Sequence, residues 1–373
     1  MKPANETELA EMIRGAQGPL RIVGGGTRAI GIAPGGARLE TGAMSGISLY
    51  EPGALTIVAA AGTPLAEVEA ALAAEGQQLS FEVPDFRELL GRMGVSTIGG
   101  VVASNAAGPR RIRVGACRDH LIGVRFVDGS GTIIKNGGRV MKNVTGYDLV
   151  KLMAGARGRL GVLTEVAFKV LPKPEVEATL MAKDMTPAAA VVAMSAALGS
   201  PYEVTGAAFL RENGVVQLRL EGLEGSVAYR SGALRHRLGR GWTVLDAGES
   251  AARWRALRDV SAFAGAAGCV WRVSVKPSDM PSVLAVLGEA PALCDWGGGL
   301  IWALLPDEGD AGAAVLRRHL AAIGGHATLV RGTARVLAHV PAMPPETPVI
   351  AALSAGLRAK FDPRGILNSD VKG

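Results

Sequence analysis

The amino-acid sequence predicts an α+β protein with a larger first domain and a smaller second domain. The chain has 373 residues, which is enough for two domains that each bury a core. Strand and helix patterns alternate at first and give way beyond Ile98 to short strands separated by turns. Prolines interrupt the pattern at Pro172 and Pro174, and again from Pro341 onwards. These boundaries divide the chain into residues 1–174, 175–340 and 341–373.

The first domain is expected to begin with alternating helices and strands. Asn5 and Glu8 have the spacing of a capping box, and the apolar residues after them predict a helix. Thr63 followed by Pro64 predicts the start of a second helix, which ends at Gly76 about three turns later. The strands expected between and beside these helices are Leu20–Val23, Ile47–Tyr50 and Leu55–Ala60.

The rest of the first domain is expected to form an antiparallel sheet, because apolar runs follow one another with turn residues between them. One such turn is predicted at Asp128-Gly129. The expected strands are Leu121–Asp128, Gly131–Asn136 and Val162–Leu171. In the second domain, Thr186 and Pro187 predict the start of an Ala-rich helix, and we expect an antiparallel sheet with helices up to about residue 340.

Composition and charge exclude several classes of protein. Charged residues make up 20% of the chain, and no apolar run approaches the ~18 residues of a membrane-spanning helix. The net charge of +6 is scattered rather than gathered in basic runs, so no nucleic-acid partner is expected. Glu6, Glu8 and Glu11 do not fit a signal peptide, and we expect a cytoplasmic protein, held at the inner face of a membrane only through partners. The three cysteines have no zinc or iron–sulfur spacing and are expected to be free thiols.

Two glycine-rich segments predict a binding site for a pyrophosphate. Gly24–Arg28 follows a predicted strand, and Ile98–Gly100 opens a run of small residues that ends at Gly108. Residues without bulk let backbone N–H groups approach an anion closely. Neither segment has the Gly-x-Gly-x-x-Gly spacing of a dinucleotide fingerprint, which disfavours NAD. Taken alone, Gly24–Gly26 is equally typical of a glycine-rich turn.

The block from Val95 to Leu171 carries four motifs that together resemble a known family. The motifs are Thr97–Gly108, Gly115–Asp119, Asn143–Leu149 and Gly155–Val166. The block is similar to FAD-binding domains of the vanillyl-alcohol-oxidase type, also called the PCMH type. With Gly138–Leu149, Trp271–Ser274 and the last fifteen residues, the chain is also similar to the small FAD-binding subunits (E subunits) of bacterial glycolate oxidases. The resemblance implies a PCMH-type fold of two subdomains, a cap domain, and a C-terminal segment that returns to the FAD domain.

The resemblance implies which residues contact FAD. Family members that bind flavin covalently carry His or Cys in stretches that match Gly24–Ala29 and Gly94–Gly100, and this chain has neither there, so non-covalent FAD is expected. Arg118 and Asp119 either pair with each other or touch FAD, and Tyr147 and Asp148 either lie near the isoalloxazine or form a buried pair. The expected FAD contacts are Gly24, Gly25, Gly26, Thr27, Arg28, Ile98, Gly99, Gly100, Asn105, Gly108, Gly115, Arg118, Asp119, Tyr147, Gly158, Gly161 and Val162.

The sequence identifies no complete active site. No metal site is expected, because the five histidines show no paired-ligand spacing. Arg272 alternates with apolar residues on a predicted strand and is the candidate anchor for a substrate carboxylate, while Arg110 and Arg111 either face an anion or are solvated or ion-paired.

The resemblance implies oxidation of glycolate to glyoxylate in a complex with a larger FAD subunit and an iron–sulfur subunit that receives the electrons. Two alternatives remain open. One is a stand-alone FAD-dependent dehydrogenase of another 2-hydroxy or sugar acid, and the other is a non-catalytic electron-relay or scaffold subunit.

Overall fold

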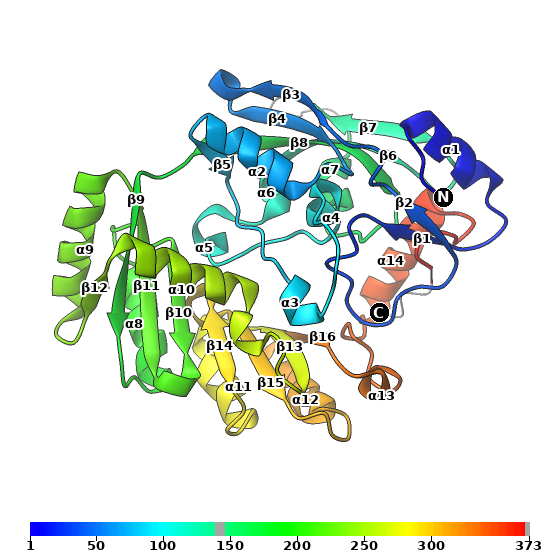
Figure 1. Cartoon of the computed structure of the whole chain (residues 1–373). Helices are drawn as coiled ribbons and strands as arrows, with labels where there is room; N and C mark the ends of the chain where they lie inside the picture. Colours follow the sequence, from blue (N-terminus) through cyan, green and yellow to red (C-terminus); the bar gives the residue numbers. More distant parts are fainter. Residues whose placement is uncertain (139–145, 370–373) are drawn as a thin grey trace.

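The computed structural model describes residues 1–138 and 146–369, which form two halves built on separate sheets (Figure 1). The halves are joined by the short connection between β8 (Val162–Pro172) and β9 (Val176–Ala182). The predicted boundary at Pro172 and Pro174 falls at this connection. The N-terminus and the described end of the chain, up to residue 369, lie beside the first half, because the C-terminal segment crosses back from the second half (Figure 1).

The larger sheet of the first half has the strand order β3-β4-β8-β6-β7, and β5 also pairs with β8. Every pair in it is antiparallel, which the sequence predicts for the strands after residue 120 but not for β3 and β4. Its other strands are β3 (Ile47–Glu51), β4 (Thr56–Ala60), β5 (Gln77–Leu79), β6 (Leu121–Val127) and β7 (Ile133–Gly137). The accompanying helices are α2 (Leu65–Ala74), α3 (Arg87–Leu90), α4 (Ile98–Ala103), α5 (Arg111–Val114), α6 (Cys117–His120) and α7 (Leu149–Met153).

A second, smaller layer of the first half consists of the parallel pair β1 (Leu20–Val23) and β2 (Ala37–Glu40) with helix α1 (Glu6–Gly15). Asn5 caps α1, since its side chain accepts a hydrogen bond from the Glu8 N–H at 2.9 Å. Ile13 of α1 and Leu20 of β1 are both buried in the core of this layer. Leu367 completes it by bridging to Leu20 after helix α14 (Pro348–Phe361), so the tail is part of this layer.

The second half is an eight-stranded antiparallel sheet with the order β12-β9-β11-β10-β14-β15-β13-β16. Its strands are β10 (Gly206–Leu210), β11 (Val215–Gly222), β12 (Thr243–Leu245), β13 (Cys269–Ser274), β14 (Ala292–Asp295), β15 (Leu300–Leu305) and β16 (His326–Arg331). Its helices are α8 (Pro187–Leu198), α9 (Glu224–Leu238), α10 (Ala247–Asp259), α11 (Met280–Val286), α12 (Ala313–Ile323) and α13 (Ala334–Leu337).

The two faces of this sheet have different neighbours (Figure 1). One face packs on α8, α9, α11 and α12 to form the largest core of the chain. The opposite face packs on Trp254 and Leu257 of α10 and on Leu89 of α3, so it looks toward the first half. A polar side chain on this second face that α10 does not cover lies between the two halves.

The structure corrects two details of the predicted elements. Residues beyond Ile98 do not go directly into strands, because three short helices, α4 to α6, come first. Thr63 does not cap helix α2, which begins at Leu65; its hydroxyl donates to the Ala60 carbonyl at 2.7 Å instead. The strands around these segments and the N-terminal cap of α8 at Thr186 are confirmed.

Candidate functional site

A cavity of about 510 Å³ lies in the first half, a volume within the usual range for small-molecule sites. The loop that follows β1, Gly24–Arg28, forms one wall, and the start of helix α4 forms another. Thr97 begins that helix by accepting a hydrogen bond from the Gly100 N–H at 3.3 Å. Strand β8 contributes Val162 and Leu163 to the lining.

The two glycine-rich walls contact each other through their backbones. A Cβ added to Gly25 would lie 1.6 Å from the Val95 carbonyl oxygen, and one added to Gly94 would lie 2.3 Å from the Gly25 oxygen. A Cβ on Gly99 would lie 2.6 Å from the Ala61 oxygen. Contacts this short exclude any side chain, so these glycines allow the walls to meet and to present their backbone groups to the cavity.

The lining of the cavity carries positive charge. Its arginines come from β1, β2, the glycine loops and the segment after α7, and are Arg21, Arg28, Arg38, Arg92 and Arg157. The described residues that line it include no Asp, Glu, His or Cys. The buried Nε atoms of Arg21 and Arg28 have no hydrogen-bond partner among the described residues. Burial lowers the pKa of Arg28, with Asp85 acting in the opposite direction. The cavity is thus built for an anion.

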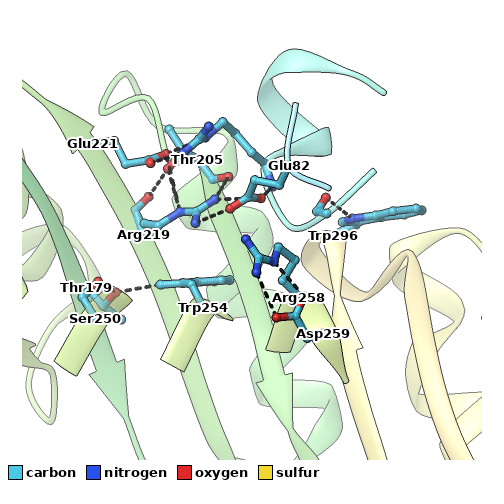
Figure 2. A network of polar contacts seen from close by, with 12 residues as sticks. Glu82, Thr179, Thr205, Arg219, Glu221, Ser250, Trp254, Arg258, Asp259 and Trp296 are labelled. Atoms are coloured by element: carbon cyan, nitrogen blue, oxygen red, sulfur yellow. Dashed lines mark hydrogen bonds and ion pairs between the residues drawn. The ribbon is translucent and has the colours of Figure 1, made fainter. Parts of the chain in front are cut away.

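An ion-pair network ties the two halves together (Figure 2). Arg219 on β11 donates to the Glu82 carboxylate at 2.8 Å and lies 3.5 Å from the carboxylate of Glu221. Arg110 pairs with Glu221 at 2.5 Å and donates its backbone N–H to Glu82 at 2.6 Å. The Arg219 side chain is 2% exposed and lies over the Trp254 ring. Burial alone would raise the pKa of Glu82, but Arg219 and Arg110 outweigh it and lower this pKa to about 2.

A second group of basic residues lies on the same sheet face without such partners. Arg272 on β13 and Arg111 on α5 both approach the ring of Trp296, with guanidinium carbons 5.2 and 4.9 Å from the ring centroid. Among the described residues, neither arginine has a carboxylate within ion-pair distance. Burial lowers the pKa of Arg272 to about 10, and repulsion from Arg111 and Arg157 adds to this effect.

Comparison with known proteins identifies the family. A family profile described as an FAD binding domain matches residues 1–137. The chain is 36% identical over 354 residues to glycolate oxidase subunit GlcE of Escherichia coli K12, covering 94% of this chain and 91% of the relative. The chain belongs to the GlcE family.

Further similarities place the GlcE-family chain among flavoproteins. It is 46% identical over 90 residues to glycolate oxidase subunit GlcD of Bacillus subtilis, covering 24% of this chain and 19% of that one. A solved structure of alkyldihydroxyacetonephosphate synthase superposes with a TM-score of 0.72 at 16% identity, covering 99% of this chain and 75% of that chain. The fold is therefore the α+β fold of PCMH-type FAD-binding proteins, and the cofactor is FAD.

The cavity of the GlcE-family chain fits this cofactor on its own chemistry. Two unpartnered Nε atoms, an acid-free lining and walls of exposed backbone suit a doubly charged pyrophosphate. The apolar part of the lining, which includes Ile22, Met153 and Leu163, suits the flat faces of an aromatic ring system.

The structure brings most of the sequence-predicted FAD contacts to the cavity. Those that line it are Gly24, Gly25, Gly26, Thr27, Arg28, Gly99, Gly100, Gly158, Gly161 and Val162. The remaining predicted residues do not line it, and these are Ile98, Asn105, Gly108, Gly115, Arg118, Asp119 and Tyr147.

The residues outside the cavity have structural roles in the loop before β6. Asp119 accepts the Ala116 N–H at 2.8 Å and lies 3.8 Å from Arg118, so the internal pairing expected for these two residues is confirmed. Asn105 accepts the Arg118 N–H at 3.0 Å. A Cβ on Gly115, whose φ is +86°, would meet the Asp119 carboxylate at 2.5 Å, so this glycine allows the turn to close.

Three further residues predicted to contact FAD lie in the core, at a contact between the halves, or at the surface. Ile98 is fully buried in the core of the first half, and the Gly108 carbonyl accepts a hydrogen bond from Trp296 Nε1 at 3.1 Å. Tyr147 is 87% exposed, which excludes the buried pair with Asp148; the Asp148 side chain instead accepts the Lys151 N–H. Residues 139–145, which make up most of the Gly138–Leu149 motif, lie outside the described residues.

Sequence reasoning missed several residues that shape the cavity. Asn368 lies near the end of the chain, yet its side-chain oxygen accepts the Ile22 N–H at 2.8 Å and its amide donates to the Arg157 carbonyl at 2.8 Å. Arg21 and Thr41 belong to the β1 and β2 layer and line the same cavity. The only sequence signal for Asn368 is the resemblance of the last fifteen residues to the family.

Neither a metal site nor a membrane span appears in the described part of the chain. No group of three His, Cys, Asp or Glu residues within 1–138 and 146–369 is arranged to hold a metal ion. None of the helices in these ranges combines the length and the apolar character needed to cross a bilayer.

Proposed function

We propose that this chain is the FAD-binding subunit of a glycolate oxidase and takes part in the oxidation of glycolate to glyoxylate. Membership of the GlcE family supports this assignment. The observation that carries it in the structure is the acid-free cavity with glycine walls in the first half. FAD would be held without a covalent bond, since no Cys or His lies among the described residues of the lining.

Particular residues would hold particular parts of FAD. Backbone N–H groups of Gly24–Gly26 and the start of helix α4 would face the pyrophosphate, where helix termini and glycine loops favour negative charge. Arg28 and Arg21 would give their free Nε–H groups to the same anion. Each contact supplies only about 0.3–1 kcal/mol, so tight binding needs many of them together with burial of the rings.

Bound FAD supplies the two-electron acceptor that oxidation of a hydroxyl-bearing carbon requires. The chain's own residues would exclude water from the cavity and orient the substrate. The hydroxyl proton needs a base, and the described lining contains no Asp, Glu or His. We therefore assign the base to a group outside this lining.

The partners proposed for this chain are a larger FAD subunit and an iron–sulfur subunit. The names of the relatives, GlcE and GlcD, support an enzyme of several subunits. Electrons from glycolate would pass through flavin to the iron–sulfur partner, because the three cysteines of this chain are free and buried. We place the complex in the cytoplasm, peripheral to the membrane through its partners.

The test is flavin retention by a variant that fills the cavity without disturbing the fold. A Cβ on Gly100 would have only the Thr97 hydroxyl, at 3.3 Å, within 4 Å, so Gly100→Val directs its bulk into the cavity. We expect the purified wild-type chain to carry one FAD, released by acid, and the variant to carry less than a tenth of it. Gly356→Val is the matched control, because this glycine of α14 has open space around it. Normal FAD content in Gly100→Val would overturn the proposed site.

A further inference from the structure

We propose that Arg111, Arg157 and Arg272 form a binding site for a small carboxylate anion between the two halves of the chain. These three residues make up the arginine cluster. The site would take the carboxylate of a 2-hydroxy acid, and this part of the inference rests on the proposed function. It assigns to the GlcE-family chain itself a contact with substrate.

The position of Arg272 is fixed by the register of the sheet. Side chains alternate along β13, so that buried Trp271 belongs to the core on one face while Arg272 belongs to the opposite face, which looks toward the first half. Arg272 pairs in register with Trp302 of β15 and Thr328 of β16. A rigid sheet thus holds the arginine at the boundary between the halves.

The second member comes from the first half and meets Arg272 at Trp296. The Trp296 indole N–H donates to the Gly108 carbonyl at 3.1 Å, and its backbone N–H donates to Asp295 at 2.7 Å, so the ring is held from both halves. Arg111 and Arg272 lie 4.9 and 5.2 Å from the centre of this ring. Cation–π contact stabilises each guanidinium by about 0.5–2 kcal/mol but leaves its charge and its N–H donors available.

The third member connects the cluster to the flavin cavity. Arg157 lines that cavity, and its proximity to Arg272 contributes to the lowered pKa of Arg272. The backbone of Arg157 has a φ of +53°, a conformation that residues other than glycine rarely adopt. Two hydrogen bonds hold it there, from its N–H to Ala103 at 3.0 Å and from Asn368 to its carbonyl at 2.8 Å. Strained residues of this kind concentrate at functional sites.

The charge of the cluster is only partly offset by the protein, since Asp119 acts to raise the pKa of Arg111 without forming an ion pair with it. In the described part of the chain, no member forms an ion pair, whereas the nearby Arg110 and Arg219 each bind carboxylates. Burial also lowers the pKa of His326, and Arg272 lowers it further, as expected where positive charge is in excess. A partly buried cation without an anion is unfavourable, and a bound anion would relieve the repulsion among the three arginines.

The geometry of guanidinium groups selects the class of ligand. An arginine offers parallel N–H donors that match the two oxygens of a carboxylate, with stronger hydrogen bonds than neutral donors give. A site next to the flavin cavity suits a substrate whose oxidised carbon is close to its carboxylate. A 2-hydroxy acid has this form, and glycolate is its smallest member.

The inference is tested by calorimetric titration of the purified full-length chain with glycolate. Ethylene glycol is the matched ligand control, since it replaces the carboxylate with an uncharged alcohol, and inorganic phosphate is the competing anion. We expect glycolate to bind and ethylene glycol not to bind. Arg272→Met should weaken glycolate binding at least tenfold, because charge-assisted hydrogen bonds are lost. The control Arg335→Met, which removes a surface arginine paired with Asp307, should bind as the wild type does.

Two outcomes would overturn the carboxylate site. One is a lack of selectivity, in which glycolate binds no more strongly than ethylene glycol or phosphate at equal concentration displaces it. The other is unchanged binding in Arg272→Met; if that variant does not fold, Arg111→Met decides in its place, since Arg111 is exposed. The FAD content of the same samples separates the two proposals. Retained FAD without glycolate binding overturns only this site, and glycolate binding without FAD overturns only the proposed cofactor role.

Discussion

Two arginines on one face of the eight-stranded sheet show how different surroundings give the same side chain different roles. Arg219 on β11 meets the carboxylates of Glu82 and Glu221, whereas Arg272 on β13 lies over the Trp296 ring and has no carboxylate within ion-pair distance among the described residues. The carboxylates outweigh burial and raise the pKa of Arg219, while burial and the neighbouring cations lower that of Arg272 to about 10.

The difference separates a structural contact from a binding site. The charge of Arg219 is satisfied within the protein, and its partner Glu82 belongs to the first half, so the ion-pair network fixes the two halves relative to each other. The charge of Arg272 is left for a ligand. Buried charges are stable only when paired, and an unpaired one beside a cofactor cavity therefore indicates function.

The largest expected effect is the removal of one carboxylate from the ion-pair network. Glu82→Ala leaves Arg219 buried without its closest partner, and the loss should be about 3–5 kcal/mol in the free energy of unfolding. Urea denaturation measures it. Glu249→Ala, which breaks an exposed pair with Arg253 one helical turn away, is the control and should cost about 1 kcal/mol or less. Equal losses in the two variants would mean that the network is not structural.

Acid should weaken the same network. The pKa of Glu82 is about 2 in the folded chain and near 4.5 when unfolded, so its contribution is present above pH 4.5 and is lost as the pH falls toward 2. The total is at most about 3 kcal/mol, since each pKa unit corresponds to about 1.4 kcal/mol. Denaturation midpoints between pH 6 and pH 3 measure this loss. In Glu82→Gln, the free energy of unfolding should fall less steeply with decreasing pH than in the wild type. An unchanged dependence on pH would contradict the assignment.

The smallest expected effect is on the stability of the chain without Arg272. Arg272→Met removes a cation that has no carboxylate partner among the described residues, so relief of repulsion should offset the lost contact with Trp296 to within about 1 kcal/mol. Arg219→Met is the matched comparison on the same sheet face, and its free energy of unfolding should fall several times as much. Thermal unfolding of both variants in glycolate-free buffer measures the contrast. A large loss in Arg272→Met would make this arginine structural as well.

The sequence predicted those parts of the cavity that are local along the chain. Gly24–Arg28 could be identified because glycines directly follow an apolar strand, and Arg272 because it alternates with buried residues. Ile98 and Asn105 show the limit of the same motif, since they stabilise the loop and helix that form the wall without facing the cavity.

The rest depended on contacts between distant segments. Arg111 and Arg157 meet Arg272 only through the packing of the two halves, and no local pattern indicates which arginine is paired. Asn368 reaches the cavity because the tail crosses back to β1, a topology that the sequence predicted only through the family resemblance.

The flavin cavity and the arginine cluster are tested together by the anaerobic absorbance spectrum of the purified chain before and after glycolate is added. A flavin in the glycine-walled cavity with the arginine cluster beside it should give an oxidised flavin spectrum at one FAD per chain, and glycolate should perturb or bleach its visible band. Arg272→Met should need at least tenfold more glycolate for the same change in the band. Bound flavin in the wild type that does not respond to saturating glycolate would contradict a substrate site in this chain.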